Sequence, residues 1–361
     1  MLATSYQRVR LWSGVTSIAL NLALAWGMFA LAPTVQRLLP HWPFPAQLGA
    51  CLLAGVLLML PFDLLVGHAV ERLVERTEQS LGAWLFDWLR GTGRFVLASW
   101  FAGLAFGYGS ELWWIWRIAI TAAVLAVCFL SAEHHFRLSP RAWRPSDPSQ
   151  ANYEESVQSE LTELKLASPP LCWMLESDAY AVNGMVVGPA MSGQSNRDAP
   201  PAVAVTTSVI KYLKPRQTAL LIAREVFQHR AGFRRLALLV SLGWLLAGLA
   251  LVWSAPSFTG AMSELKSALL GMAIMTTWCL VALFIWPLWN RYWVRRADGY
   301  LLTLAPLAEV QELLVLVQQL NATDIELPSV KTTIFHPIPP LSERMHYLSP
   351  NEPNPTTPVL P

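Results

Sequence analysis

The sequence predicts a mainly α-helical, polytopic membrane protein with about six transmembrane helices and a soluble part that contains a short β-hairpin. The first observation behind this prediction is composition: 54% of the residues are hydrophobic and only 14% are charged, which is too apolar for an ordinary soluble chain. The second is the presence of six stretches of about 17 to 24 mostly apolar residues, each long enough to cross a hydrocarbon core of roughly 30 Å. The third is that lysine and arginine gather in alternate connections between these stretches.

The six predicted spans lie near residues 11–33, 48–66, 94–109, 112–131, 236–254 and 267–289. The first span is long for a secretory h-region and lacks a clear small-x-small cleavage site, so we interpret it as a retained anchor. The connections on one side of the membrane hold most of the arginines, whereas the GYGSE connection on the other side holds none. The positive-inside rule therefore predicts that both termini and the large polar segment are cytoplasmic, in an integral protein of a bacterial inner membrane.

These spans divide the chain into five predicted parts. Residues 1–131 form an N-terminal membrane region with four spans and a cytoplasmic helix near 68–91; residues 132–235 are a cytoplasmic segment; residues 236–289 form a transmembrane hairpin; residues 290–348 return to the cytoplasm; and residues 349–361 are a disordered, Pro-rich tail. Because spans five and six form a hairpin, we expect residues 290–302 to lie beside a helix at 218–232.

The cytoplasmic segment 132–235 is predicted to contain both strands and helices. Two short β-prone runs, LCWMLES at 171–177 and AVAVTTSVI at 202–210, are predicted to pair as the hairpin. The following stretch, KYLKPRQTALLIAREVFQHRAGF, is predicted to be helical, with Pro215 in its first turn.

Several motifs along the chain are similar to those of one family. They are LPF, which opens residues 59–91 and leads to the pair Phe86 and Asp87; NGMVVG at 183–188; AVAVTTSVIKYLKPRQ; LLIAREVFQHRAGF; and HPIPPLSERM at 336–345. In this order, around a membrane hairpin, they resemble the CAAX prenyl endopeptidase type I and HtpX-like integral-membrane zinc metallopeptidases over most of the chain. The resemblance implies that segments 132–235 and 290–348 together form a metallopeptidase-like domain.

The zinc ligands of that family are replaced here. The family's helix reads H-E-x-x-H. Residues four apart share a helix face, so the two histidines can coordinate one zinc ion while the glutamate polarises the metal-bound water. The aligned residues begin at Arg224, continue with Glu225 and end at Gln228, so only the position of the base is retained. The third ligand of the family is a glutamate, whose position in RYWVRRAD is occupied by Val294.

A zinc ion at this position is therefore not expected, although the family resemblance implies one. Arginine does not deprotonate, valine has no donor atom, and a glutamine carbonyl is a poor zinc ligand. The supporting residues that the resemblance assigns, Arg291, Asp298 and Arg344, are present.

Two residues leave alternatives open at this stage. His229 stands four residues after Glu225 and, with His336, offers a displaced metal site; alternatively, it is a polar residue near the membrane surface. Arg224 is expected to form an ion pair with Asp298 or Glu225 as a structural substitute for zinc; alternatively, its side chain snorkels to lipid headgroups.

The function predicted from these observations is that of a catalytically inactive metallopeptidase homologue, a pseudoprotease that acts as a binding, scaffold or regulatory subunit of a membrane assembly. One alternative is a divergent metalloendopeptidase with displaced ligands. Another is a transporter or channel, for which Arg117 is the main intramembrane charge. We expect contact with the lipid bilayer and with a protein partner, such as a membrane protein or a hydrophobic peptide segment. We expect no nucleic acid or nucleotide, because the net charge is only +2 and no phosphate-binding loop is evident.

Overall fold

The computed structural model describes residues 2–74, 77, 79–109, 143–144, 148–166, 171–174, 182–186, 203–254, 262–321 and 338–348. The chain forms two compact units, which we describe separately. The hydrophobic unit comprises Arg8–Ala132 and Ser241–Leu283. The sheet unit comprises Met1–Gln7, Glu133–Val240 and Phe284–Pro361. Predicted span 112–131 with Arg117, the residue His336 and the predicted tail 349–361 lie outside the described residues.

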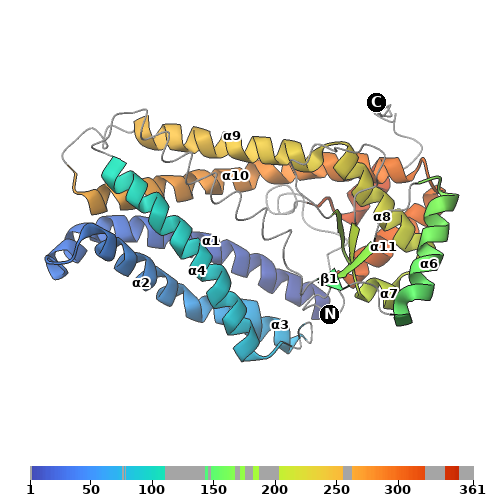
Figure 1. Cartoon of the computed structure of the whole chain (residues 1–361), viewed down its shortest axis with the longest axis horizontal. Coiled ribbons are helices and arrows are strands. Elements are labelled where there is room, and N and C mark those ends of the chain that lie inside the picture. The colour runs from blue at the N-terminus through green and yellow to red at the C-terminus, as the bar shows by residue number, and fades with distance from the viewer. Residues whose placement is uncertain are drawn as a thin grey trace. The chain divides into compact units, whose positions relative to one another are not determined.

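The hydrophobic unit is built from long helices (Figure 1). They are α1 (Leu2–Leu38), α2 (Phe44–Leu64), the π-helical turn η1 (Leu65–Ala69), α3 (Val70–Leu73), α4 (Leu81–Gly109), and most of α9 (Phe233–Ser254) and α10 (Glu264–Leu301). Its core lies where α2 meets the start of α10, around the fully buried Leu48 and Leu265. Many of the remaining large apolar side chains are exposed, as expected of helices whose solvent is lipid.

Four helical stretches among the described residues are long and apolar enough to span a membrane, namely Leu11–Leu38, Phe44–Leu73, Arg235–Ser254 and Glu264–Leu301. They coincide with four of the six predicted spans. The predicted span 94–109 lies within α4, which is helical but does not belong to these four. The protein is therefore a mainly helical integral membrane protein.

The sheet unit contains four short strands in the order β1-β2-β4-β3. They are β1 (Trp143–Arg144), β2 (Leu171–Met174), β3 (Gly184–Val186) and β4 (Val203–Thr206). The predicted hairpin between β2 and β4 is wrong, because these strands pair in parallel. Parallel neighbours need a crossover connection, and the 28 residues between the two strands supply its length. The antiparallel neighbour of β4 is β3, which forms an edge of the sheet.

Helices pack around this sheet and supply most of the unit's core. They are α6 (Pro148–Glu163), α7 (Ser208–Tyr212), α8 (Pro215–Arg230), α11 (Leu307–Leu320) and α13 (Leu341–Leu348). The helix α8 contacts β3, β4 and α6, and Figure 1 shows it beside the strands. It begins at Pro215 as predicted, and the backbone N–H of Lys214 donates to Oε1 of Gln217 at 3.0 Å. It ends before Gly232, whose φ of 76° favours glycine and separates α8 from α9.

Candidate functional site

The helix α8 places Arg224 and Glu225 at the centre of the candidate site. Seven consecutive residues before them, from Gln217 to Ala223, are buried, so the middle of this helix is held in the core of the sheet unit. One turn later, the ring of Phe227 stacks on Tyr300 of α10, with ring centroids 4.5 Å apart. These contacts bring α8 and the C-terminal part of α10 together, as the predicted neighbourhood of 218–232 and 290–302 requires.

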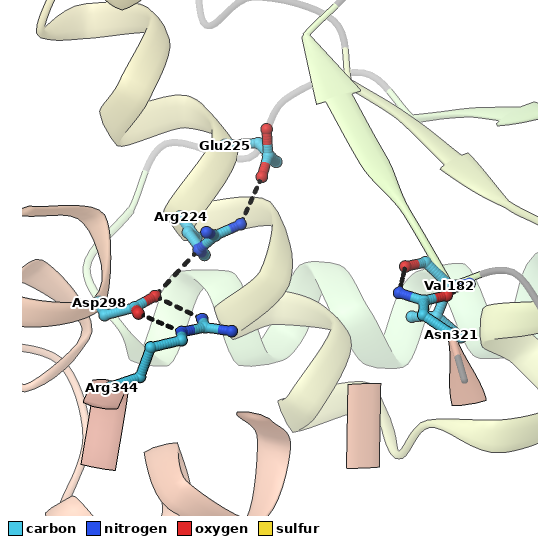
Figure 2. Close-up of polar contacts among 6 residues, drawn as sticks. All are labelled: Val182, Arg224, Glu225, Asp298, Asn321 and Arg344. Carbon is cyan, nitrogen blue, oxygen red and sulfur yellow. Dashed lines mark hydrogen bonds and ion pairs between the residues drawn. The ribbon is translucent and has the colours of Figure 1, made fainter. Parts of the chain in front are cut away.

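Asp298 is the residue on which three helices converge (Figure 2). Its carboxylate lies on α10, is only 1% exposed, and accepts two hydrogen bonds from Arg344 of α13. The Nε–H of Arg344 donates to Oδ2 at 2.6 Å and the Nη2 group donates to Oδ1 at 2.8 Å. From α8, the Nε–H of Arg224 donates to Oδ1 at 3.2 Å. Bidentate arginine–carboxylate pairs are geometrically specific, so this contact holds α13 in one orientation on α10.

Arg224 also binds the carboxylate next to it in the sequence. Its Nη1 group donates to Oε1 of Glu225 at 3.1 Å, so one guanidinium bridges Glu225 and Asp298. The side chain of Arg224 is 16% exposed. The predicted ion pair is thus confirmed, and it involves both of the candidate carboxylates instead of one.

The protonation of this cluster is set by burial and by the opposing charges. Burial alone would lower the pKa of Arg224, but Asp298 and Glu225 outweigh it and raise the pKa above its ordinary value. Burial raises the pKa of Glu225, and the neighbouring Arg224 only partly opposes this rise. Arg224 therefore remains a cation, whereas Glu225 takes up a proton more readily than an exposed glutamate does.

Glu225 lies against the edge strand β3. A Cβ atom built on Gly184 would stand 3.4 Å from Cγ of Glu225, so the glutamate side chain packs against the strand at van der Waals distance. Just before this strand, the side chain of Asn321 makes two hydrogen bonds with the backbone of Val182 (Figure 2). The N–H of Val182 donates to Oδ1 at 2.8 Å, and Nδ2 of Asn321 donates to the carbonyl of Val182 at 3.0 Å. Asn321, which follows α11, thereby ties that helix to the edge strand.

A second set of charged residues lies on the same helices. Arg291, buried on α10, lies 3.9 Å from a carboxylate oxygen of Glu343. Arg295, one turn further along α10, forms a short ion pair with the other oxygen of Glu343. Together with the Arg344–Asp298 pair, these contacts join α13 to α10 through neighbouring residues of both helices.

The other residues that the resemblance aligns with zinc ligands, Gln228 and Val294, and the separate candidate His229 are placed as follows. Val294 lies on α10 and is buried, at 8% exposure. Gln228 and His229 lie on α8 and are half-buried.

The chemistry of these side chains does not fit a zinc ion at the family position. Of the residues that the resemblance aligns with zinc ligands, Arg224 carries a guanidinium that is already bonded to two carboxylates, and Val294 is an aliphatic side chain in the core. A cation cannot coordinate a second cation, and valine offers no donor atom. Within the described ranges, no group of three histidine, cysteine, aspartate or glutamate side chains is placed to hold a metal ion.

Sequence reasoning found Arg224, Glu225 and Asp298 but missed their neighbours. It named Arg344 without its bidentate pairing to Asp298, and it did not single out Glu343 or Asn321. Two features of the sequence could have indicated the Glu343 contacts. Glu343 is an acidic residue next to Arg344 in SERM, and RYWVRRAD contains the adjacent basic residues Arg295 and Arg296.

The fold is that of a helical membrane protein in which residues of α8, α10 and α13 form the carboxylate cluster. A solved structure with this fold is the crystal structure of Ste24p from S. mikatae. It superimposes with a TM-score of 0.67, covers 96% of this chain and 88% of that chain, and shares 13% sequence identity. No family model matches the sequence, and no curated protein matches it significantly. At this level of identity the likeness shows a Ste24-like fold.

Proposed function

We propose that this protein is a catalytically inactive membrane metallopeptidase homologue, a pseudoprotease that acts by binding, as a scaffold or regulatory subunit of a membrane assembly. The Ste24-like fold supports a relationship to membrane metallopeptidases, and the motifs at 59–91, 183–188 and 336–345 support the CAAX prenyl endopeptidase family in particular. The partner in this proposal is a membrane protein or a hydrophobic peptide segment, and both termini and the sheet unit are cytoplasmic.

The observation that carries this proposal is the bridge that Arg224 makes between Glu225 and Asp298. In a zinc peptidase of this family, the residue before the glutamate binds the metal, and the glutamate activates a metal-bound water. Here the guanidinium supplies positive charge at that place without an open coordination position. Glu225 accepts a hydrogen bond from it and is held as part of an ion cluster.

The first experiment measures metal and activity on the purified full-length chain. We expect zinc well below one ion per chain, and no peptide cleavage that a chelator abolishes. The variant Glu225→Gln should leave any background cleavage unchanged. One zinc ion per chain, together with chelator-sensitive cleavage that Glu225→Gln abolishes, would establish the divergent-enzyme alternative and overturn this proposal.

The second experiment tests the binding role directly. Crosslinking in membranes followed by purification of the full-length chain should recover a specific protein, and Glu225→Gln should recover the same protein in the same amount, because catalysis is not needed for binding. An unrelated membrane protein, crosslinked and purified in the same way, serves as the control. If both recover the same set of proteins, the result counts against the scaffold role.

A further inference from the structure

Two buried indole N–H groups on α10 have no acceptor. They belong to Trp289 and Trp293, and neither atom has a hydrogen-bond partner among the described residues. Trp293 is only 4% exposed, and the two rings are neighbours, with centroids 6.2 Å apart. Buried indole N–H groups usually find a partner because an unmade buried hydrogen bond is costly. Two such donors one helical turn apart are therefore candidates to bind an acceptor from outside the chain.

The same helix face carries a cation. Tyr292, Trp293 and Arg296 follow Trp289 at spacings of three, four and seven, so all four residues lie on one side of α10. The guanidinium carbon of Arg296 lies 5.3 Å from the Trp293 ring centroid and 5.7 Å from that of Tyr292. The opposite side of the helix carries Asp298 and the candidate site.

Acidic residues are few along α10 in the sequence, and Glu343 of α13, which reaches this part of the helix, is paired with Arg291 and Arg295. After Glu264, which opens α10, the only acidic residue before Glu309 is Asp298, whose carboxylate is occupied by two arginines. The start of α9 packs nearby through Phe233, whose ring centroid lies 5.4 Å from that of Trp293. The connection from α8 into α9 reads HRAGFRR and adds basic residues only. With the Arg296 guanidinium against the Trp293 ring, an acceptor at the two indoles is favoured to be an anion.

The position along α10 indicates which anion. The predicted hydrocarbon-spanning stretch ends at residue 289, so at 1.5 Å per residue Trp293 lies about 6 Å and Arg296 about 10 Å beyond it along the axis. The headgroup layer is roughly 5 to 8 Å thick on each side of a bilayer. With this predicted span end, Trp293 and Arg296 are expected at the depth of the headgroups and Trp289 at the inner edge of that layer.

We propose that the face of α10 formed by Trp289, Trp293 and Arg296 binds the phosphate of one anionic phospholipid. The two indole N–H groups donate to its oxygens, and Arg296 balances its charge. This site is separate from the Arg224 cluster, and it does not depend on whether the protein is a pseudoprotease.

Native mass spectrometry of the full-length, delipidated chain in detergent tests the proposal, with phosphatidylglycerol and phosphatidylcholine as the two probes. We expect one phosphatidylglycerol to be retained in preference to phosphatidylcholine. Trp289→Phe and Trp293→Phe remove a donor and keep an aromatic ring, so each should weaken retention by at least about tenfold. Arg296→Gln should abolish the preference for the anionic lipid.

The matched control is Trp42→Phe, which changes an indole that is 51% exposed in the hydrophobic unit and should retain the lipid like the unaltered chain. The melting temperature without lipid shows whether each variant is folded, and Arg296→Gln tests the site even if the phenylalanine variants unfold. Equal retention of the two lipids, or unchanged retention in all three variants, would overturn the proposal. Displacement of phosphatidylglycerol by inorganic phosphate would show a site for small anions and would overturn the lipid assignment.

Discussion

Replacement of Arg224 by glutamine should destabilise the protein by an amount that depends on pH. The substitution removes the cation that bridges Glu225 and Asp298. Removing one partner of a buried ion pair typically lowers the free energy of unfolding by about 3–5 kcal/mol. Asp298 keeps both hydrogen bonds from Arg344, so the carboxylate left without a cation is that of Glu225. We therefore expect the lower end of that range at neutral pH, about 3 kcal/mol.

The pH dependence follows from Glu225. Its pKa is raised above the ordinary value of 4.5 by burial, and Arg224 opposes this rise; without Arg224 the folded-state pKa should rise further. A carboxyl group with a raised folded-state pKa binds its proton more tightly in the folded chain. Its contribution to stability is therefore fully present below the unfolded pKa and is lost as the pH rises through the folded pKa. Compared with the unaltered protein, Arg224→Gln should be least impaired at acid pH and most impaired at neutral and alkaline pH.

Thermal unfolding of the purified full-length protein in detergent, between about pH 5 and about pH 8, measures this effect. The matched control is the double variant Arg224→Gln/Glu225→Gln, in which residue 225 no longer carries a carboxylate that lacks a cationic partner. It should unfold at a higher temperature than Arg224→Gln at the alkaline end and show a flatter dependence on pH. The reasoning is refuted if Arg224→Gln unfolds like the unaltered protein at every pH, or if the double variant is no more stable than the single variant.

The remaining predictions concern the metal position, the bidentate pair and the edge strand. The triple variant Arg224→His/Gln228→His/Val294→Glu should bind about one zinc ion by metal analysis, whereas Arg224→His alone should not, because two of the three ligands are still missing; tight zinc binding by the single variant would contradict the account of the site. Arg344→Lys keeps the charge but loses the second parallel hydrogen bond, so it should lower the melting temperature, and an unchanged value would show that the bidentate geometry is not needed. Asn321→Ala removes two hydrogen bonds to the backbone and should speed amide exchange across residues 182–186, with no effect expected in α1 as an internal reference.

The elements of this fold that could be predicted are those set by local pattern. Hydropathy located the four spans at Leu11–Leu38, Phe44–Leu73, Arg235–Ser254 and Glu264–Leu301, because length and apolarity alone decide whether a helix can cross a bilayer. Pro215 located the start of α8. The pairing of β2 with β4 could not be predicted in the same way, since strand propensity does not say whether neighbours run parallel. That depends on the crossover between them and on β3, which takes the antiparallel position.

The candidate site shows the same division. The ion pair of Arg224 was predictable from charge together with the family resemblance, because an arginine aligned with a zinc ligand can neutralise Glu225 and Asp298. The bidentate contact of Arg344 was not, because it depends on how α13 docks on α10. The hydrogen bonds of Asn321 to Val182 join residues 139 positions apart, and no spacing in the sequence indicates them.

The bridge made by Arg224 has a consequence for how the protein matures in the cell. A metal ion must be captured from a limited supply and can be lost again to competing ligands. A guanidinium arrives with the polypeptide, in a fixed ratio of one per chain. The meeting point of α8, α10 and α13 can therefore be completed as soon as these three helices have been made, at a pace set by chain synthesis and membrane insertion, and it should form equally well in cells that are starved of zinc.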